Sequence, residues 1–381
     1  MRRRATVWLL GALFMTSAQA PLATVAPAPL PTVQDPRLQL AYTFGRISNA
    51  VTTTVDGRIF VGFPQTEGPE VQVQEILPGS GEARPYPDAA WNRGPAAAGG
   101  DLSHSFVLIN ALRIGPDGAL WLMDAGSPGI GKPAVPGGAR LFRVDLATNT
   151  VSRVYDLSST SRTMSYIDDI RFNGGQAYLT DAGDPALLVL DLATGQVRRV
   201  LDHDPSTTDT KTMRADGKEL FDDKGQPKRV HADQLEVSPD GRWLYYLPAS
   251  GPIYRIETRW LDNAALPATQ LAAHVEPWLD TPTTGGTAID ATGTIYYGDA
   301  NARRILLIRP DRSVSTLIAD PRLIWIDAMW IDTKGTLWIP ANQQNLSPGF
   351  NGGKSEVNYP VAIYTMKVDA QPSPIDHGSA H

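Results

Sequence analysis

The chain has 381 residues, a formal net charge of −6 at pH 7 and no cysteine. Its length suits one large all-β or barrel-like domain with a sizeable core. The acidic balance argues against nucleic acid and anionic membrane surfaces as partners, and the lack of cysteine excludes thiol chemistry, disulfides and Cys-ligated zinc.

The N-terminus has the layout of a secretory signal peptide over residues 1–20. Three arginines at positions 2–4 precede an apolar run that is too short to span a bilayer, and Ala-Gln-Ala at 18–20 provides a small-residue cleavage site. We therefore expect a secreted or periplasmic protein, with a short membrane anchor as the alternative interpretation. Residues 21–36 are rich in Pro and Ala and predict a linker, and residues 370–381 predict a disordered tail.

Between these ends, residues 37–369 repeat one hairpin. In the copy NALRIGPDGALWLMDAG, which starts at Asn110, two strands flank a GPDG turn, and counting by two puts Asn110 on the face of Leu112 and Ile114. Related hairpins begin at Asn49, Asp168, Asp233, Gly285 and Asp327. In five of the six copies the turn glycine lies eight residues after the first residue, which chance recurrence of Asp-Gly turns in a β-sandwich does not explain.

Several copies are followed by a second strand pair, so that one repeat makes a four-stranded blade. The sequence therefore predicts an all-β fold, a six-bladed β-propeller. After the last hairpin only VAIYTMKV is available as a third strand. We expect LQLAYTFGRI near the N-terminus to supply the missing strand of the last blade and to close the ring.

Five of the six hairpins begin with Asn or Asp: Asn49, Asn110, Asp168, Asp233 and Asp327, with Gly285 as the exception. In a propeller the first strand of each blade lines the central channel, so these side chains would converge at one mouth of it. A hard divalent cation such as Ca²⁺, or a directly bound ligand, would relieve their mutual repulsion. The alternative is that each side chain only hydrogen-bonds local backbone where its strand begins.

Aromatic residues follow two patterns along the chain. Those of the second strands, Trp121, Tyr246, Tyr297 and Trp338, are expected in the core between blades. Loop residues such as Trp91, Tyr166 and Trp325 are better candidates for lining a channel mouth. The segment from His203 to Val230 is long for a connection and predicts a loop over that mouth, with its own turns at Asp216-Gly217 and Lys224-Gly225.

The ordered set of segments resembles the major royal jelly protein and yellow family, in its bacterial branch. The similar segments are FVLINALRIGPDGALWLMDAG, YIDDIRFNGGQAYLTDAG, ADQLEVSPDGRWLYYLPASGPIYRI and IWIDAMWIDTKGTLWIPANQQN, and together they cover most of residues 40–369. The resemblance implies a secreted six-bladed propeller with a small-molecule site at one mouth of its channel. Insect members are associated with dopachrome conversion, nutrition and the binding of biogenic amines.

The family is similar in architecture to the gluconolactonase and regucalcin group, in which Asn, Asp and Glu at the channel mouth hold a divalent cation. By position, Asn110, Asp168 and Asp233 match metal ligands of that wider group. Gly285 stands where the royal jelly family tends to have Asp, and Asn49 stands where the wider group has Glu. The resemblance thus implies Ca²⁺ or another divalent cation, and no organic cofactor.

The first functional hypothesis is a monomeric binding or conversion protein of the yellow type. It would hold a small aromatic or amine-bearing molecule, with no nucleic acid partner and no membrane contact once the signal is removed. Charge would come from Asp168, Asp169 and Asp233. Hydrogen bonds would come from Asn49, Asn110 and Asn342, with Asp327 completing the acidic ring, and Tyr166 or Trp325 would stack on the ligand.

The second hypothesis is a metal-dependent lactonase or esterase. A cation held by Asn110, Asp168 and Asp233 would polarise the ester carbonyl, and Asp233, His231 or His104 would act as general base. Both histidines are expected on loops that enter the same mouth. The third hypothesis is an interaction propeller in which the acidic ring has no ligand; no serine hydrolase, P-loop, zinc protease or dinucleotide-binding motif is present.

Overall fold

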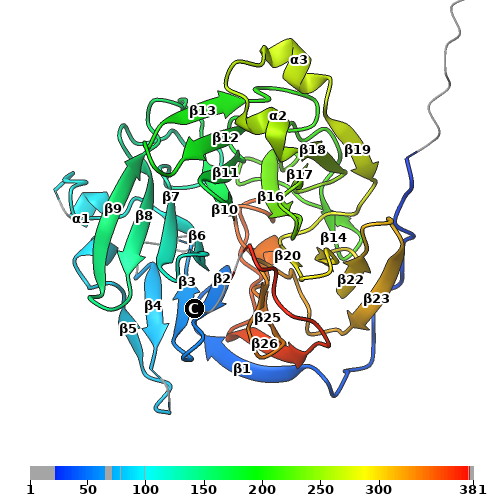
Figure 1. Cartoon of the computed structure of the whole chain (residues 1–381). Helices are drawn as coiled ribbons and strands as arrows, with labels where there is room; N and C mark the ends of the chain where they lie inside the picture. The colour runs from blue at the N-terminus through cyan, green and yellow to red at the C-terminus, as the bar shows by residue number, and fades with distance from the viewer. Residues whose placement is uncertain (1–21, 65–70, 78, 98, 376, 378–381) are drawn as a thin grey trace, which may run out of the picture.

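The computed structural model describes residues 22–64, 71–77, 79–97, 99–375 and 377. Six four-stranded antiparallel sheets surround a common centre and form a six-bladed β-propeller, which confirms the predicted fold (Figure 1). The expected signal peptide lies outside the described residues. Within the described part of the chain, no helix combines the length and the apolar character that crossing a membrane would require.

Each of the first three blades is a meander of four strands. Blade 1 consists of β2 (Ala50–Thr53), β3 (Ile59–Gly62), β4 (Val73–Ile76) and β5 (Ala83–Pro85). Blade 2 consists of β6 (Ile109–Ile114), β7 (Leu120–Ala125), β8 (Ala139–Asp145) and β9 (Thr150–Asp156). Blade 3 consists of β10 (Ile167–Asn173), β11 (Gln176–Asp181), β12 (Ala186–Asp191) and β13 (Val197–Val200).

Blades 4 and 5 repeat this order, and blade 6 takes its outer strand from the other end of the chain. Blade 4 consists of β16 (Ala232–Val237), β17 (Trp243–Pro248), β18 (Ile253–Glu257) and β19 (Glu276–Leu279). Blade 5 consists of β20 (Thr287–Ile289), β21 (Ile295–Asp299), β22 (Arg304–Ile308) and β23 (Val314–Ala319). Blade 6 consists of β24 (Trp330–Ile331), β25 (Thr336–Ala341), β26 (Val361–Lys367) and β1 (Gln39–Phe44).

Ring closure follows the prediction. Strand β1 pairs antiparallel with β26, in a register that places Gln39 opposite Thr365 and Phe44 opposite Val361. The N-terminal strand therefore completes the last blade, and Figure 1 shows blue β1 beside red β26.

The turn glycines explain why the hairpin spacing is regular. Gly57, Gly118, Gly241, Gly293 and Gly335, the five equally spaced turn residues, all have φ between +67° and +93°. This left-handed backbone suits glycine because it has no Cβ. In blade 3 the residue with positive φ is Gly174, not Gly175.

The core lies between neighbouring blades. One cluster packs Trp121 and Met123 of blade 2 against Ile170 and Phe172 of blade 3. The other second-strand aromatics named above behave similarly: Tyr246 and Tyr297 are fully buried and Trp338 packs against core clusters. They are core residues, as expected.

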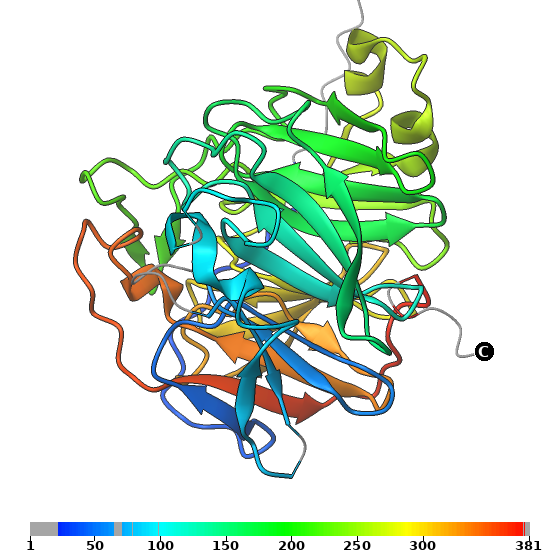
Figure 2. The same cartoon turned by 90° about the vertical axis from the view of Figure 1, so that its left-hand side faces the viewer.

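Short helices and one extra hairpin join the strands. They are η1 (Trp91–Arg93), α1 (Gly94–Ala97), α2 (Thr258–Asp262), α3 (Ala268–Ala272), η2 (Gln344–Leu346) and the hairpin of β14 (Arg214–Ala215) with β15 (Lys218–Glu219). The hairpin turns at Asp216-Gly217, and a second turn, in which the Asp222 N–H donates to the Gln226 carbonyl, follows it. Figure 2 shows the green segment 203–230 and the orange-red segment 342–360 on one side of the ring.

The two ends of the described chain contact the blades. The Val25 N–H donates to the carbonyl of Asp280, and the Asp35 N–H donates to Oδ2 of Asp320 in the region of blade 5. At the other end, Pro372 forms an isolated antiparallel β-bridge with Asp290. The centre of the His377 ring lies 4.2 Å from that of Trp330. The described residues of the expected linker and tail thus lie against the propeller.

Candidate functional site

A cavity of about 630 Å³ lies where the N-terminal ends of the innermost strands converge. The first residues of all six hairpins line it: Asn49, Asn110, Asp168, Asp233, Gly285 and Asp327. Tyr166, Trp325 and His231 also line it. The structure therefore brings most of the predicted site residues into one place.

Bulges in the innermost strands direct these side chains. The pairing of β6 with β7 shifts between Ile109 and Ala111, so Asn110 is an extra residue in its strand. Ile109, not Asn110, shares the apolar cluster of Leu112 and Ile114. Counting by two was therefore wrong at this residue, because a bulge changes the face on which the following side chains lie.

The same irregularity recurs in the next two innermost strands. The register of β10 shifts between Ile167 and Ile170, across Asp168 and Asp169, and that of β16 shifts between Ala232 and Leu235, across Asp233 and Gln234. In both strands the flanking apolar residues share one core cluster. Each bulge thus releases a polar side chain toward the cavity without disturbing the core.

Asp168 and Asp233 form the acidic centre of the site. Both are more than nine-tenths buried, and their carboxyl groups are close enough to share a proton. Burial raises the pKa of Asp168 well above its usual range, and the charge of Asp233 raises it further. Burial and the charge of Asp327 likewise raise the pKa of Asp233. The pair therefore holds a proton near neutral pH.

An amide relay connects this pair to blade 1. Asn49 Nδ2 donates to the Asn110 carbonyl at 2.5 Å, and Asn110 Nδ2 donates to Asp168 Oδ1 at 2.5 Å. The Tyr166 hydroxyl donates to Asn110 Oδ1 at 2.8 Å. Asn110 is thus fully engaged, whereas Asn49 Oδ1 is a buried acceptor with no hydrogen-bond partner.

Asp327 is the third buried carboxyl group of the cavity. Its burial raises its pKa to about 7, although the Ala328 N–H and the side chains of Asn342 and Trp325 lower it. Asn342 Nδ2 donates to Asp327 Oδ2 at 2.8 Å. Asn342 does not line the cavity; it positions Asp327.

Gly285 interrupts the ring for a steric reason. A Cβ at this position would lie 2.3 Å from Trp325 Nε1 and 2.7 Å from the Ile326 carbonyl oxygen. Trp325 itself has φ of +53° and lines the cavity. The indole therefore fills the space that a side chain of blade 5 would use.

His231 lines the cavity as a hydrogen-bond donor. The Asp209 N–H donates to His231 Nδ1 at 3.0 Å, which places the proton of the neutral ring on Nε2. Burial lowers the pKa of His231 and so favours this neutral form. In this tautomer its Nε2 cannot act as the expected general base.

Besides Asn342, three residues expected at the site do not line the cavity: His104, Trp91 and Asp169. His104 does not line the cavity; it is exposed, its ring stacks on Trp91 at 4.3 Å, and its Nε2 lies 3.6 Å from Asp88 Oδ2. The Asp169 carboxylate forms an ion pair with Arg171 at 2.7 Å, and Arg171 also forms an ion pair with Glu236 at 2.9 Å. The bulge in β10 explains why adjacent aspartates have different surroundings.

Sequence reasoning missed the residues that fix the backbone leading into the innermost strands. Asp124, at the end of β7, accepts hydrogen bonds from the N–H groups of Val107 and Leu108. Asp181, at the end of β11, accepts from the Tyr166 N–H at 2.9 Å. The available signal was the Asp-Ala-Gly repeated at the C-terminal end of both strands.

It also missed the residues that cover the cavity. Lys228 and Phe350 belong to the two segments on the covered side, and Gln234 and Gln344 each carry a buried side-chain oxygen with no partner. Lys228, Phe350 and Gln344 lie outside the repeats, so no regular spacing marks them, whereas Gln234 follows Asp233 within the bulge of β16.

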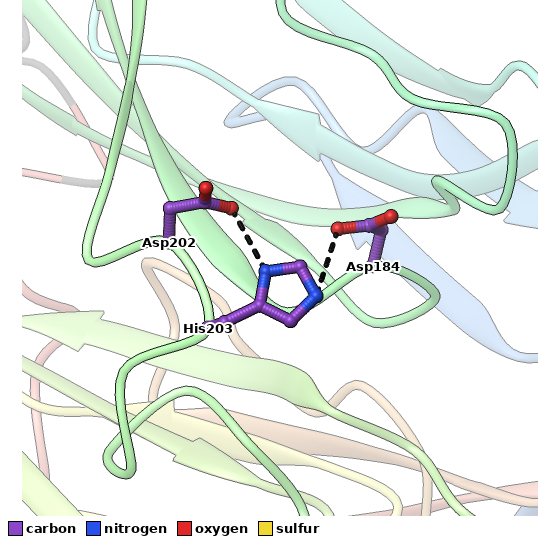
Figure 3. Close-up of side chains that lie close together, drawn as sticks. All are labelled: Asp184, Asp202 and His203. Atoms are coloured by element: carbon purple, nitrogen blue, oxygen red, sulfur yellow. Dashed lines mark hydrogen bonds and ion pairs between the residues drawn. The ribbon is translucent and has the colours of Figure 1, made fainter.

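A second acidic cluster, Asp184, Asp202 and His203, lies outside this cavity (Figure 3). His203 Nδ1 lies 3.2 Å from Asp202 and Nε2 lies 3.6 Å from Asp184. Arg199 already binds both carboxylates at 2.9 Å. These guanidinium contacts compensate the negative charge that would otherwise attract a cation.

Comparisons with known proteins agree with this architecture. The luciferin-regenerating enzyme matches with a TM-score of 0.56 at 9% identity, covering 90% of this chain and 98% of that chain. Regucalcin, a calcium-binding protein from Agrobacterium tumefaciens, matches with a TM-score of 0.54 at 11% identity over 90% and 98%. A putative gluconolactonase matches with a TM-score of 0.54 at 10% identity over 92% and 99%.

At these identities the structures show a shared fold. No curated protein sequence matches the chain. The family model described as major royal jelly protein matches residues 110–375, from the first residue of the second hairpin into the C-terminal segment. This match spans well over half of the sequence, and the chain belongs to the major royal jelly protein family.

Proposed function

We propose that this protein is exported and binds a small amine-bearing aromatic molecule in the acidic cavity. One observation carries the proposal: three buried carboxyl groups, those of Asp168, Asp233 and Asp327, line a single cavity of about 630 Å³. Buried carboxyl groups without a cationic partner are costly, and a ligand ammonium group would supply that partner.

The remaining lining residues suit such a ligand. An ammonium group offers three donors, and Asn49 Oδ1 and Gln234 Oε1 are buried acceptors without partners. Tyr166, Trp325 and Phe350 provide aromatic surface on the same cavity. The ligand would sit at the mouth of the propeller's central channel.

Conversion of the ligand is also compatible with this site. The carboxyl pair of Asp168 and Asp233 shares a proton, so one oxygen can accept a proton from a bound molecule while another returns it. This is the chemistry of a dopachrome-type isomerisation, in which a proton moves and no bond to water forms.

Calorimetry tests the binding proposal. Wild-type protein should bind members of a panel of amines, catechols and indoles. Binding an ammonium group should also release protons, because a cation favours the ionised form of the carboxyl pair, and titrations in two buffers of different ionisation enthalpy detect this release. Asp233→Asn should weaken binding at least about tenfold, the value of a lost charge-assisted hydrogen bond.

The exposed Asp311 provides the matched control, because Asp311→Asn removes the same charge from a turn of blade 5 that does not line the cavity. Its affinity should stay close to that of the wild type. Absence of binding across the panel would favour an interaction propeller without a ligand, and an unchanged affinity in Asp233→Asn would remove the acidic pair from the site.

A metal-dependent lactonase or esterase is the second candidate. The observation that favours it is the set of oxygen atoms at the cavity: Asp168 and Asp233 with the unpartnered Asn49 Oδ1 fit a hard cation. Asn110 fits less well, since its Oδ1 already accepts from Tyr166 and Asn49. When bound, a cation would polarise a lactone carbonyl. His231 would contribute a hydrogen bond from Nε2.

Elemental analysis of the purified protein and lactone hydrolysis in the presence of chelator separate the two candidates. A stoichiometric divalent cation, with hydrolysis lost in chelator and in Asp233→Ala, would establish the second. Hydrolysis that persists in chelator would exclude a metal-dependent reaction.

Export and oligomeric state are proposed from the sequence. Residues 1–20 would direct export to the periplasm or medium and be removed, and the folded chain would act as a monomer without nucleic acid or membrane partners. Cell fractionation with N-terminal sequencing, together with light scattering, tests these points. A cytoplasmic or membrane-bound product that keeps residues 1–20 would contradict them.

A further inference from the structure

Lys228 is a buried lysine in the segment that covers the cavity. Its side chain is 6% exposed and lines the cavity, and Nζ lies 4.2 Å from the centre of the Phe350 ring. Among the described residues, no carboxylate or carbonyl oxygen pairs with this ammonium group in a hydrogen bond or ion pair. By contrast, Lys132, on another covering loop, binds Asp223 at 2.9 Å.

The surroundings of Lys228 leave its charge incompletely compensated. Burial lowers its pKa to about 8, while Asp222 and Asp223 raise it and Lys132 lowers it. The amine is therefore mostly protonated at pH 7. An aromatic face offers a buried cation only part of the stabilisation that an anion would give.

The cavity thus has two poles of opposite charge. The charges of Asp233 and Asp327 raise the pKa of Asp168, and the charge of Asp327 raises that of Asp233, whereas the carboxylates that raise the pKa of Lys228 are Asp222 and Asp223 of its own segment. The negative pole lies at the ends of the innermost strands, and the positive pole lies in the covering segment. A ligand that bridges them would carry a positive and a negative group.

We propose that Lys228 binds the carboxylate of a zwitterionic ligand whose ammonium group lies against Asp168, Asp233 and Asp327. This inference rests on the proposed binding function and narrows its ligand class. The cavity would then select aromatic amino acids, or molecules with the same two charges, over the corresponding amines. Lys228 is a specificity-determining residue in this arrangement.

Tryptamine and L-tryptophan test the inference, because they differ only by the carboxylate. Calorimetry at pH 7 should show that wild-type protein binds L-tryptophan at least about tenfold more tightly than tryptamine. In Lys228→Met this preference should fall to about one, with tryptamine affinity unchanged. Methionine keeps a long flexible apolar side chain, and equal thermal unfolding midpoints would verify that the variant is folded.

Lys218→Met is the matched control. Lys218 belongs to the same segment 203–230, is exposed and does not line the cavity, so this variant removes the same charge and should keep the preference. A wild-type protein that binds tryptamine as tightly as L-tryptophan would overturn the inference and leave the proposed amine site standing. An equal loss in both lysine variants would also overturn it, because a general charge effect would explain the data. Failure of both probes to bind would overturn this inference, and absence of binding across the whole panel of amines, catechols and indoles would remove the proposed function as well.

Discussion

Asp233 and Asp327 have higher pKa values in the folded chain than in the unfolded one, where an aspartate titrates near 4. Their protonated forms are therefore favoured by folding. The contribution of these protonated groups to the free energy of unfolding is complete below about pH 4. It is lost as the pH rises through the folded-state pKa of each group, and for Asp327 this pKa is about 7. The free protein thus loses stability between pH 4 and 8 at the groups proposed to bind its ligand.

Asp233→Asn should stabilise the free protein at pH 8, because it removes a buried charge, and should have little effect at pH 4.5. Thermal unfolding across this range gives the measurement. Asp320→Asn is a control of opposite sign: burial raises the pKa of Asp320, but hydrogen bonds from Arg322 and from backbone N–H groups lower it overall, so its loss should destabilise at pH 8. A lower midpoint for Asp233→Asn at pH 8 would contradict the argument.

Gly285→Ala should destabilise the protein, because the new Cβ would meet the Trp325 indole at 2.3 Å. Overpacking of this kind typically costs about 1–3 kcal/mol. Denaturant unfolding measures the change. Gly175→Ala is the control, since a Cβ there has no neighbour within 4 Å and the residue lacks a positive φ. Equal stability of the two variants would show that the Trp325 side chain moves aside without cost.

At the scale of the strand, regular repeats predicted far more than single side chains. The turn glycines require a left-handed backbone, so their spacing is a direct consequence of local stereochemistry and identifies the blades. The faces of Asn110 and Asp169 depend on bulges, and a bulge adds one residue without leaving a clear mark in composition. The ring of Asn and Asp residues could be predicted from the repeats. The direction in which each of their side chains points could not.

The second strand of blade 3 has a further role that only its contacts reveal. Asp181 Oδ1 accepts from the Tyr166 N–H, and Oδ2 accepts from Ser165 Oγ and pairs with Arg199 at 2.8 Å. The carboxylate therefore fixes the residues that lead into β10. Tyr166 in turn donates to Asn110 across the blade boundary.

Asp181→Asn should lower the free energy of unfolding by about 1–3 kcal/mol, because an amide NH₂ would face donors in a buried site. Ligand affinity should fall as well, since Tyr166 would lose its anchor. Denaturant unfolding and calorimetry measure both effects. Asp191→Asn, on an exposed turn of the same blade, is the comparison and should leave ligand affinity unchanged. Unaltered ligand affinity in Asp181→Asn would mean that the position of Tyr166 is set by packing alone.

At the scale of the whole molecule, the sequence repeats form the blades of the propeller. The segments between the repeats cover the cavity. Lys228 and Phe350 come from connections of different blades and meet only in the folded chain. His104 shows the converse: six residues before Asn110 in sequence, it is held at the surface by Trp91 and Asp88. Proximity along the chain is a poor guide where loops are long.

Ring closure is the last property that belongs to the whole molecule. Strand β1 covers the free edge of β26, and Leu38, just before it, is 2% exposed within the core of blades 5 and 6. A chain that begins at Gly45 would expose the edge of β26 and this apolar surface. We expect it to lose cooperative unfolding or to associate, whereas a chain that begins at Leu22 keeps every described contact and should remain a folded monomer. Size-exclusion chromatography and thermal unfolding compare the two, and equal midpoints would show that five complete blades and a three-stranded sixth suffice.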